Sequence, residues 1–159
     1  MHVRELPGVA SVGLVYSLPF STDSGSAPYV IDGDEPGDGS ARTGDVQTID
    51  EHYFSTMAMP VLKGRGFSPD DDSEAPQVAI IDAELARQAF GERDPIGERI
   101  ATSSINGELL WRTVVGVVVS IKQQSLAQPS AVATYYWPYR QSPTRTFRLV
   151  IKTDLPLAQ

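Results

Sequence analysis

The amino-acid sequence predicts an α+β fold, with mixed sheets and a few short helices. Three features of residues 46–118 carry this prediction. An apolar strand, a carboxylate at a helix start and a Gly or Pro stop follow one another twice, which is typical of a compact unit of strands and helices. Asn106-Gly107 is a strong hairpin signal, and residues 114–119 form the densest apolar run. We expect the flanking segments to add further strands.

Composition restricts the class of protein. The 159 residues suffice for one domain or for two lobes that share a sheet, and 41% hydrophobic with 21% charged residues is typical of a globular chain with a real core. The net charge of −7, with no cluster of Lys and Arg in the sequence, disfavours binding to nucleic acid or to anionic lipids. The absence of cysteine excludes a disulfide framework, a thiol nucleophile and a cysteine zinc site.

The two ends of the sequence are abrupt. No apolar run reaches the ~20 residues that a membrane span needs, and the first residues lack a secretory signal. We therefore expect a segment cut from a longer protein.

The first third of the chain predicts strands separated by loops. Residues 9–20 alternate as a half-buried strand that stops at Pro19. Its expected apolar face consists of Val12, Leu14, Tyr16 and Leu18, with Val15 on the opposite face. Residues 21–44 are rich in Ser, Gly, Asp and Pro, so we expect two mobile loops around a short strand at 29–31.

A first short helix follows a strand predicted at residues 46–49. Asp50 stands where an N-cap carboxylate accepts the first free amides, and Glu51 favours the helix dipole. Pro60 ends the helix. Its apolar face, which we interpret as core rather than as a ligand site, consists of Tyr53, Phe54, Met57 and Ala58.

Two glycines around Arg65 predict a bend or positive φ angles, and Phe67 is expected to anchor this turn in the core. The run Asp70-Asp71-Asp72 lacks the alternating ligands and central Gly of a calcium loop, so it predicts a solvated turn. The glycines also lack the Lys-Ser/Thr continuation of a phosphate-binding loop.

The second helix has the clearest signals. Residues 78–81 predict a buried strand, Asp82 an N-cap, and Gly91 a left-handed stop after a helix at 83–90. The buried face of this helix is expected to consist of Leu85, Ala86, Ala89 and Phe90.

The rest of the chain predicts a tight turn and four strands. Residues 94–97 predict the turn, and 98–102 with 109–119 predict the arms of the Asn106-Gly107 hairpin. The apolar second arm is expected to lie centrally in a sheet. The last two strands are predicted at 132–137, stopped by Pro138, and at 146–153.

No residue pattern supports catalysis, a metal site or a cofactor site. A nucleophilic triad or a zinc site needs suitably placed histidines, and only His2 and His52 exist. No dinucleotide fingerprint follows a strand. Tyr135 and Trp137 face one side of a strand and Tyr136 the other, which favours packing over a binding groove.

An ordered series of short motifs nevertheless resembles a known family. The series is Leu6-Pro7-Gly8-Val9, Tyr53-Phe54, Met59-Pro60, Leu62, Gly64-Arg65, Phe67, Asp71, residues 78–81, Leu85-Ala86-Arg87, Phe90, Asp94-Pro95-Ile96-Gly97, Val115-Gly116-Val117 and Tyr136-Trp137-Pro138. It resembles the MacB-like periplasmic core domain of ABC transporter permeases of the MacB/FtsX type. The resemblance covers almost the whole chain. Met59 and Trp137 depart from the residues usual in the family.

The resemblance implies a non-enzymatic domain on the periplasmic side of the inner membrane, lying between two transmembrane helices of its own permease chain. A porter-like lobe would comprise residues 1–49 and 114–159, and an inserted sabre-like lobe residues 50–113. The implied partners are those helices, a separate cytoplasmic ATP-binding domain or subunit, a periplasmic adaptor or substrate protein, and a second copy in a dimer. No cofactor, metal or nucleic acid is implied.

The implied function is to couple ATP-driven helix movement to export or extraction of an envelope substrate. The residues expected to hold the shape of the domain are Tyr53, Phe54, Gly64, Arg65, Phe67, Phe90, Gly97, Gly116 and Pro138. Tyr135, Trp137 and Tyr139 are candidates for a contact surface, as are residues 21–44. Two alternatives stay open: a module that binds a small amphipathic or lipid-linked molecule, and an enzyme with a cleft at His52 or at residues 70–72.

Overall fold

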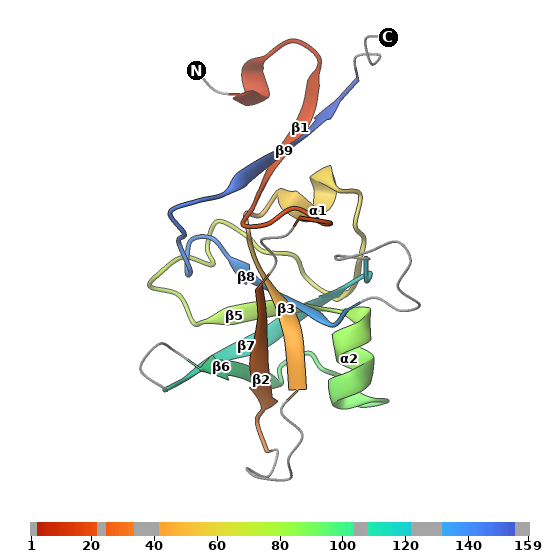
Figure 1. The fold of residues 1–159 in the computed structure, drawn as a ribbon, viewed down its shortest axis with the longest axis vertical. Helices are drawn as coiled ribbons and strands as arrows, with labels where there is room; N and C mark the ends of the chain where they lie inside the picture. Colours follow the sequence, from red (N-terminus) through yellow and green to blue (C-terminus); the bar gives the residue numbers. More distant parts are fainter. Residues whose placement is uncertain (1–2, 22–24, 34–41, 104–107, 122–131, 155–159) are drawn as a thin grey trace.

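A computed structural model describes residues 3–21, 25–33, 42–103, 108–121 and 132–154 (Figure 1). In chain order the elements in these ranges are η1 (Val3–Glu5), β1 (Val9–Val15), β2 (Gly25–Ile31), β3 (Arg42–Ile49), α1 (Tyr53–Thr56), β4 (Val61–Gly64), β5 (Val78–Asp82), α2 (Ala83–Phe90), β6 (Arg99–Ser103), β7 (Leu109–Val118), β8 (Thr134–Pro138) and β9 (Arg148–Thr153). The predicted α+β class with mixed strand directions is confirmed.

Six strands form a closed ring. The strand order is β2-β6-β7-β5-β8-β3, and an additional pairing of β2 with β3 closes the circuit. We call these six strands the ring. β4 pairs with β7 beside it, and β7 contacts β6, β5 and β4, so the apolar strand lies centrally as predicted. Because the circuit closes, these six strands do not form an open sheet with a free edge strand at each end.

Two cores follow from strand alternation. The first contains Ala79 and Ile81 of β5 together with Tyr135 of β8, and α2 adds Leu85, Ala89 and Phe90. The second lies on the opposite face, where Ile80 and Tyr136 pack against α1 and the segment that follows it. Neighbouring residues therefore serve different cores, as the period of two requires.

β1 and β9 form a two-stranded ribbon that extends from the ring, and η1 and the C-terminal end of β9 lie at its far end (Figure 1). The strands pair antiparallel from Val9 with Thr153 to Val15 with Arg148. Among the described residues, the ribbon joins the ring through one strand pairing, Val15 with Ile49 of β3.

The prediction for residues 9–20 was wrong in two respects. The strand ends at Val15, and Val15 is fully buried whereas Leu18 is exposed. The reason is that α1 packs on the face that holds Gly13 and Val15.

The segment 21–44 has more strand than predicted. β2 contains the expected residues 29–31 but begins at Gly25, and β3 begins at Arg42 rather than at Val46. These extensions pair with each other from Gly25 with Val46 to Tyr29 with Arg42. Residues 22–24 and 34–41 lie outside the described residues.

Helix α1 is shorter than predicted, and Asp50 is not its cap. The helix covers four residues, with His52 at the N-cap position and no side-chain cap. Ala58 has a φ of 53° and is exposed, whereas Met59 is buried. The carboxylate of Asp50 binds elsewhere, as described below.

Helix α2 agrees with its prediction in both bounds and caps. Asp82 Oδ1 accepts a hydrogen bond from the Leu85 amide at 2.8 Å, and Gly91 has a φ of 59°. The hairpin arms pair as β6 and β7, while its turn at 104–107 lies outside the described residues. The last strands begin two residues later than predicted, and β8 includes Pro138.

Candidate functional site

The joint between the ribbon and the ring is the candidate functional site, and we call it the junction. Asp50 connects the two parts twice. Its amide donates to the Leu14 carbonyl at 3.2 Å, and its Oδ1 accepts from the Leu14 amide at 2.9 Å. Oδ1 also accepts from the His52 amide at 3.2 Å. Burial raises the pKa of Asp50, although these backbone hydrogen bonds oppose the shift.

On one side of the junction, Arg4 of η1 reaches over β1. Its guanidinium lies 2.7 Å from His52 Nε2 and 3.6 Å from Asp50 Oδ2, and it donates to the Val12 carbonyl at 3.2 Å. A pocket of about 200 Å³ lies here, lined by Arg4, His52, Ser55 and residues 9–12. The nearby Ser55 hydroxyl donates to the His52 carbonyl and not to its ring, so this pair lacks the nucleophile-to-base hydrogen bond of a hydrolase.

The middle of the junction depends on a glycine. A Cβ on Gly13 would lie 2.7 Å from Tyr53 Cα, so only glycine lets β1 approach α1 this closely. Tyr53 is fully buried at this contact, and burial raises its pKa to about 12. Phe54, next in the chain, packs edge-to-face on Tyr136 with ring centroids 4.9 Å apart. The aromatic core thus reaches the ribbon directly.

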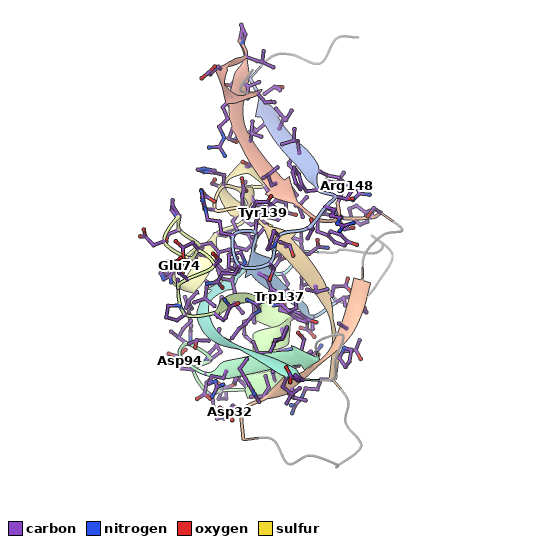
Figure 2. All side chains as sticks on the ribbon, turned by 90° about the vertical axis from the view of Figure 1, so that its left-hand side faces the viewer. Asp32, Glu74, Asp94, Trp137, Tyr139 and Arg148 are labelled. Atoms are coloured by element: carbon purple, nitrogen blue, oxygen red, sulfur yellow. The ribbon has the colours of Figure 1, made fainter. Side chains whose placement is uncertain are left out.

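On the other side, the segment after β8 ties the ring to β9. The Tyr139 amide donates to the Ile49 carbonyl at 2.7 Å, and the Tyr139 ring meets the Phe147 ring edge-to-face at 5.6 Å. Arg148 Nη1 donates to the Tyr16 carbonyl at 2.6 Å. Figure 2 shows Arg148 and Tyr139 near the base of the ribbon and Trp137 farther along the body.

A second group of predicted residues lies where β4 meets β7. A Cβ on Gly64 would lie 2.2 Å from the Val115 carbonyl oxygen, and a Cβ on Gly116 would lie 2.2 Å from that of Arg65. The two backbones therefore approach each other through glycines on both strands. Gly64 has a φ of 67°, which the pair of glycines around Arg65 predicted.

Asp71 corrects the prediction of a solvated turn. Its carboxylate is buried and accepts a bidentate pair from Arg65, with distances of 2.7 and 2.8 Å, and a hydrogen bond from the Ser68 amide. Burial works to raise the pKa of Asp71, but the bonds from Arg65 and Ser68 outweigh it and hold that pKa below its usual value. Phe67 is buried beside this turn, as expected.

The candidate contact residues do not share one exposed surface. Tyr135 is fully buried in the first core, so it cannot be part of a contact surface in this structure. Trp137 is half-buried, and Arg112 lies 4.4 Å above its ring. Tyr139 is half-buried at the junction. The packing interpretation of the aromatic strand is therefore the correct one for Tyr135.

Arg112 is a buried residue that the sequence did not single out. In the described part of the chain its side chain donates hydrogen bonds to Gln77, Gln141 and Ser142, all of which are neutral. Burial lowers the pKa of Arg112 to about 10. The three remaining predicted residues have structural positions: Phe90 is buried on α2, Gly97 has a φ of 88° in its turn, and Pro138 is buried at the end of the ring strand β8.

Within the described ranges, no group of three or more His, Cys, Asp or Glu side chains could hold a metal ion. No helix there has both the length and the apolar character needed to span a membrane. Sequence reasoning missed the roles of Arg4, Asp50 and Arg148 in the junction, because each bonds to a residue far away in the chain. The local signals at these positions gave no information about such partners.

Comparisons of this chain with known proteins agree on one protein family. The sequence pattern of the MacB-like periplasmic core domain matches residues 3–154. Over 54 residues the chain is 37% identical to the macrolide export ATP-binding/permease protein MacB of Bdellovibrio bacteriovorus, a stretch that covers 34% of this chain and 8% of that protein.

Two solved structures share the fold. The periplasmic region of MacB from Actinobacillus actinomycetemcomitans has a TM-score of 0.62 at 20% identity, covering 97% of this chain and 63% of that one. The extracellular domain of the ABC-type transporter YknZ from Gram-positive bacteria has a TM-score of 0.63 at 17% identity, covering 96% and 69%. The chain thus spans less than a tenth of the curated relative and about two thirds of each solved domain.

Proposed function

Because this chain belongs to the family of MacB-like periplasmic core domains, we propose that it is the extracytoplasmic domain of an ABC transporter permease and acts as a coupling element. In this role it transmits ATP-driven movement of transmembrane helices to the export or extraction of a substrate in the cell envelope. The domain performs no reaction of its own. ATP hydrolysis belongs to a separate cytoplasmic domain or subunit.

The observation that carries the proposal is the construction of the junction. In the described part of the chain, one strand pairing and the close contact of Gly13 with Tyr53 join ribbon and ring. Further connections are hydrogen bonds and ion pairs made by Asp50, Arg4, Arg148 and the Tyr139 segment. A joint of this kind can change its angle by exchanging a few hydrogen bonds while both parts keep their internal pairing. The ribbon is then the input and the ring the output of the movement.

The division into two lobes is part of this proposal. The porter-like lobe comprises residues 1–49 and 114–159, and the sabre-like lobe residues 50–113. Strand β7 crosses the boundary at residue 113, so the lobes would share a strand and move as parts of one sheet. The ribbon belongs wholly to the first lobe.

The proposed setting is the inner membrane with the domain facing the periplasm. Its partners are the transmembrane helices of the same permease chain, the ATP-binding domain or subunit, a second copy of the permease, and an adaptor or substrate protein in the envelope. Tyr139 and Trp137 stay candidates for the contact surface.

A disulfide across the junction tests the proposal, since the chain contains no native cysteine. Ser11 and Ser55 line the same pocket, one on β1 and one on α1, and both would be replaced by Cys in the full-length transporter. Oxidation should lower substrate-coupled ATP turnover several-fold, and a reductant should restore it. The control pair is Leu14→Cys with Leu149→Cys, which are opposite each other within the ribbon. Because the bonds of Asp50 to Leu14 involve only the Leu14 backbone, this disulfide does not cross the junction and keeps its hydrogen bonds. Equal turnover of the oxidised and reduced Ser11/Ser55 pair would refute the coupling role.

A further inference from the structure

His52 lies between a cation and a carboxylate in the junction. Its Nε2 is 2.7 Å from Nη1 of Arg4, which belongs to η1, and 3.8 Å from Oε1 of Glu51. Arg4 also lies 3.6 Å from Oδ2 of Asp50. The side chains of Arg4 and His52 are 51% and 42% exposed, so protons from the solvent reach this contact. Protonation of one ring nitrogen can therefore change which of these groups are bound to each other.

The bond between Arg4 and His52 requires a neutral ring. A guanidinium group has N–H donors and no acceptor, so Nε2 of His52 must accept this hydrogen bond. The neutral imidazole then carries its proton on Nδ1. A second proton would occupy Nε2 and remove the acceptor. Two cations would then face each other at hydrogen-bond distance, which is unfavourable.

Protonated His52 has a different partner within reach. Oε1 of Glu51 can accept from a protonated Nε2 after a small rotation of either side chain. Oδ1 of Asp50 already accepts from two backbone amides, and its Oδ2 faces Arg4. Protonation therefore moves His52 from Arg4 to Glu51 and leaves Arg4 with its longer contact to Asp50.

Three further charged groups surround this contact: Arg140 after β8, Lys152 on β9 opposite the pocket residue Ser11, and Glu5 on η1. In the described part of the chain, none of the three bonds to His52. Arg140 instead lies 3.6 Å from Oε1 of Glu51 and holds that carboxylate on the ring side of the junction. The response of His52 to protonation is therefore decided by Arg4 and the two carboxylates.

η1 depends on Arg4 for its attachment to the ring side of the junction. In the described ranges, the side-chain bonds of η1 all come from Arg4, and its bond to the Val12 carbonyl stays within the N-terminal part of the chain. Without His52, the attachment is reduced to the 3.6 Å contact with Asp50. Ion pairs at such exposure are weak, so η1 should become mobile when His52 is protonated.

We propose that the contact between Arg4 and His52 is a proton-controlled brace of the junction. When His52 is neutral, the brace fastens η1 to the segment before α1. When His52 is protonated, η1 is released and the junction loses one of its connections. Imidazole is the side chain that gains a proton between about pH 8 and pH 5. The consequence for transport rests on the coupling role proposed above, because a junction with fewer bonds changes its angle more easily.

The test is NMR spectroscopy of the 159-residue chain at about pH 8 and about pH 5.5. Only two histidines are present in the sequence, so their ring signals are readily assigned. At the higher pH, His52 should carry its proton on Nδ1. The backbone order parameters of residues 3–5 should be about 0.85 there and fall below about 0.6 at the lower pH, while those of β5 stay high at both.

Two variants of His52 separate its charge from its shape. His52→Gln offers Arg4 an amide oxygen that does not titrate, so η1 should stay ordered at both pH values. His52→Lys carries a fixed charge, so η1 should be mobile at both. The matched control is His2→Gln, which removes the other histidine and should respond like the wild type. Because the His52 side chain is 42% exposed, these variants should keep the wild-type melting temperature at about pH 8.

Three results would overturn the proposal. The first is a proton on Nε2 of His52 at the higher pH, and the second is equal order of η1 at both pH values. The third is a pH response that survives in His52→Gln, which would assign the response to Asp50, whose pKa is raised by burial. These measurements need no transporter, so their outcome is independent of the Ser11/Ser55 disulfide test of coupling.

Discussion

Asp82 should make the stability of this domain depend on pH in an unusual direction. Its carboxylate is fully buried at the start of α2, where it accepts hydrogen bonds from the amides of Leu85 and Thr134. Burial is the largest influence and raises the pKa of Asp82 from 3.8 to about 6, against the lowering effect of those hydrogen bonds. The unfolded chain gives up this proton near pH 3.8, and the folded chain keeps it until about pH 6.

Between these two values the folded state binds more protons, so the free energy of unfolding falls as the pH rises. A shift of about two units, at 1.36 kcal/mol per unit, corresponds to a total loss of about 3 kcal/mol, of which about 2 kcal/mol falls between pH 4 and pH 7. Asp82→Asn keeps an oxygen that can accept from the Leu85 amide and removes the titration. The free energy of unfolding of this variant should therefore lack the part of the pH dependence that Asp82 contributes.

The assay is urea unfolding of wild type and Asp82→Asn, followed by tryptophan fluorescence at several pH values from 4 to 7.5. Asp50 and Asp71 also titrate with shifted pKa values, but both proteins contain them, so their contributions cancel in the difference. That difference should change by about 2 kcal/mol across the window. A difference constant to within about 0.5 kcal/mol would refute the reasoning, because mutations without a specific mechanism already vary by that amount.

Two further predictions concern the contact between β4 and β7. Gly116→Ala should destabilise the domain by about 1–3 kcal/mol in urea unfolding, because the new Cβ would overlap the Arg65 carbonyl, whereas Gly25→Ala, which has open space, should stay within about 0.5 kcal/mol of wild type. Asp71→Asn should cost about 1–2 kcal/mol, because Arg65 loses its bidentate anion but stays half exposed to water. Equal midpoints for Gly116→Ala and Gly25→Ala, or an unchanged midpoint for Asp71→Asn, would contradict these interpretations.

Two aspartates show how far the sequence could predict the structure. Asp50 and Asp82 both follow an apolar strand and precede a short helix, and both therefore predicted an N-cap. Asp82 fulfils this role, since its partner Leu85 is three residues away. Asp50 instead binds the Leu14 amide, 36 residues earlier in the chain. A local pattern predicts a local partner and carries no information about a competing one from another strand.

The same limit applies to the ring and to Asp71. The strands themselves were predictable from alternation, but the pairing of β2 with β3 that closes the ring is a tertiary contact. The run of three aspartates looked uniformly solvated, yet the turn directs only Asp71 inward to Arg65. For the junction, the sequence shows which residue types are present but not which of them contact each other. The family resemblance, which rests on many positions in order, was the stronger guide.

The antiparallel pairing of the ribbon also determines how it responds to load. Its hydrogen bonds run across the strands, and Val9 and Thr153 face each other at its far end. A force that separates these two residues strains one pair of bonds at a time, so the ribbon unzips at low force. A force that moves both residues together strains none of these bonds, and it reaches the Val15–Ile49 pairing undiminished. The ribbon is therefore stiff to common motion of its two ends and compliant to their separation.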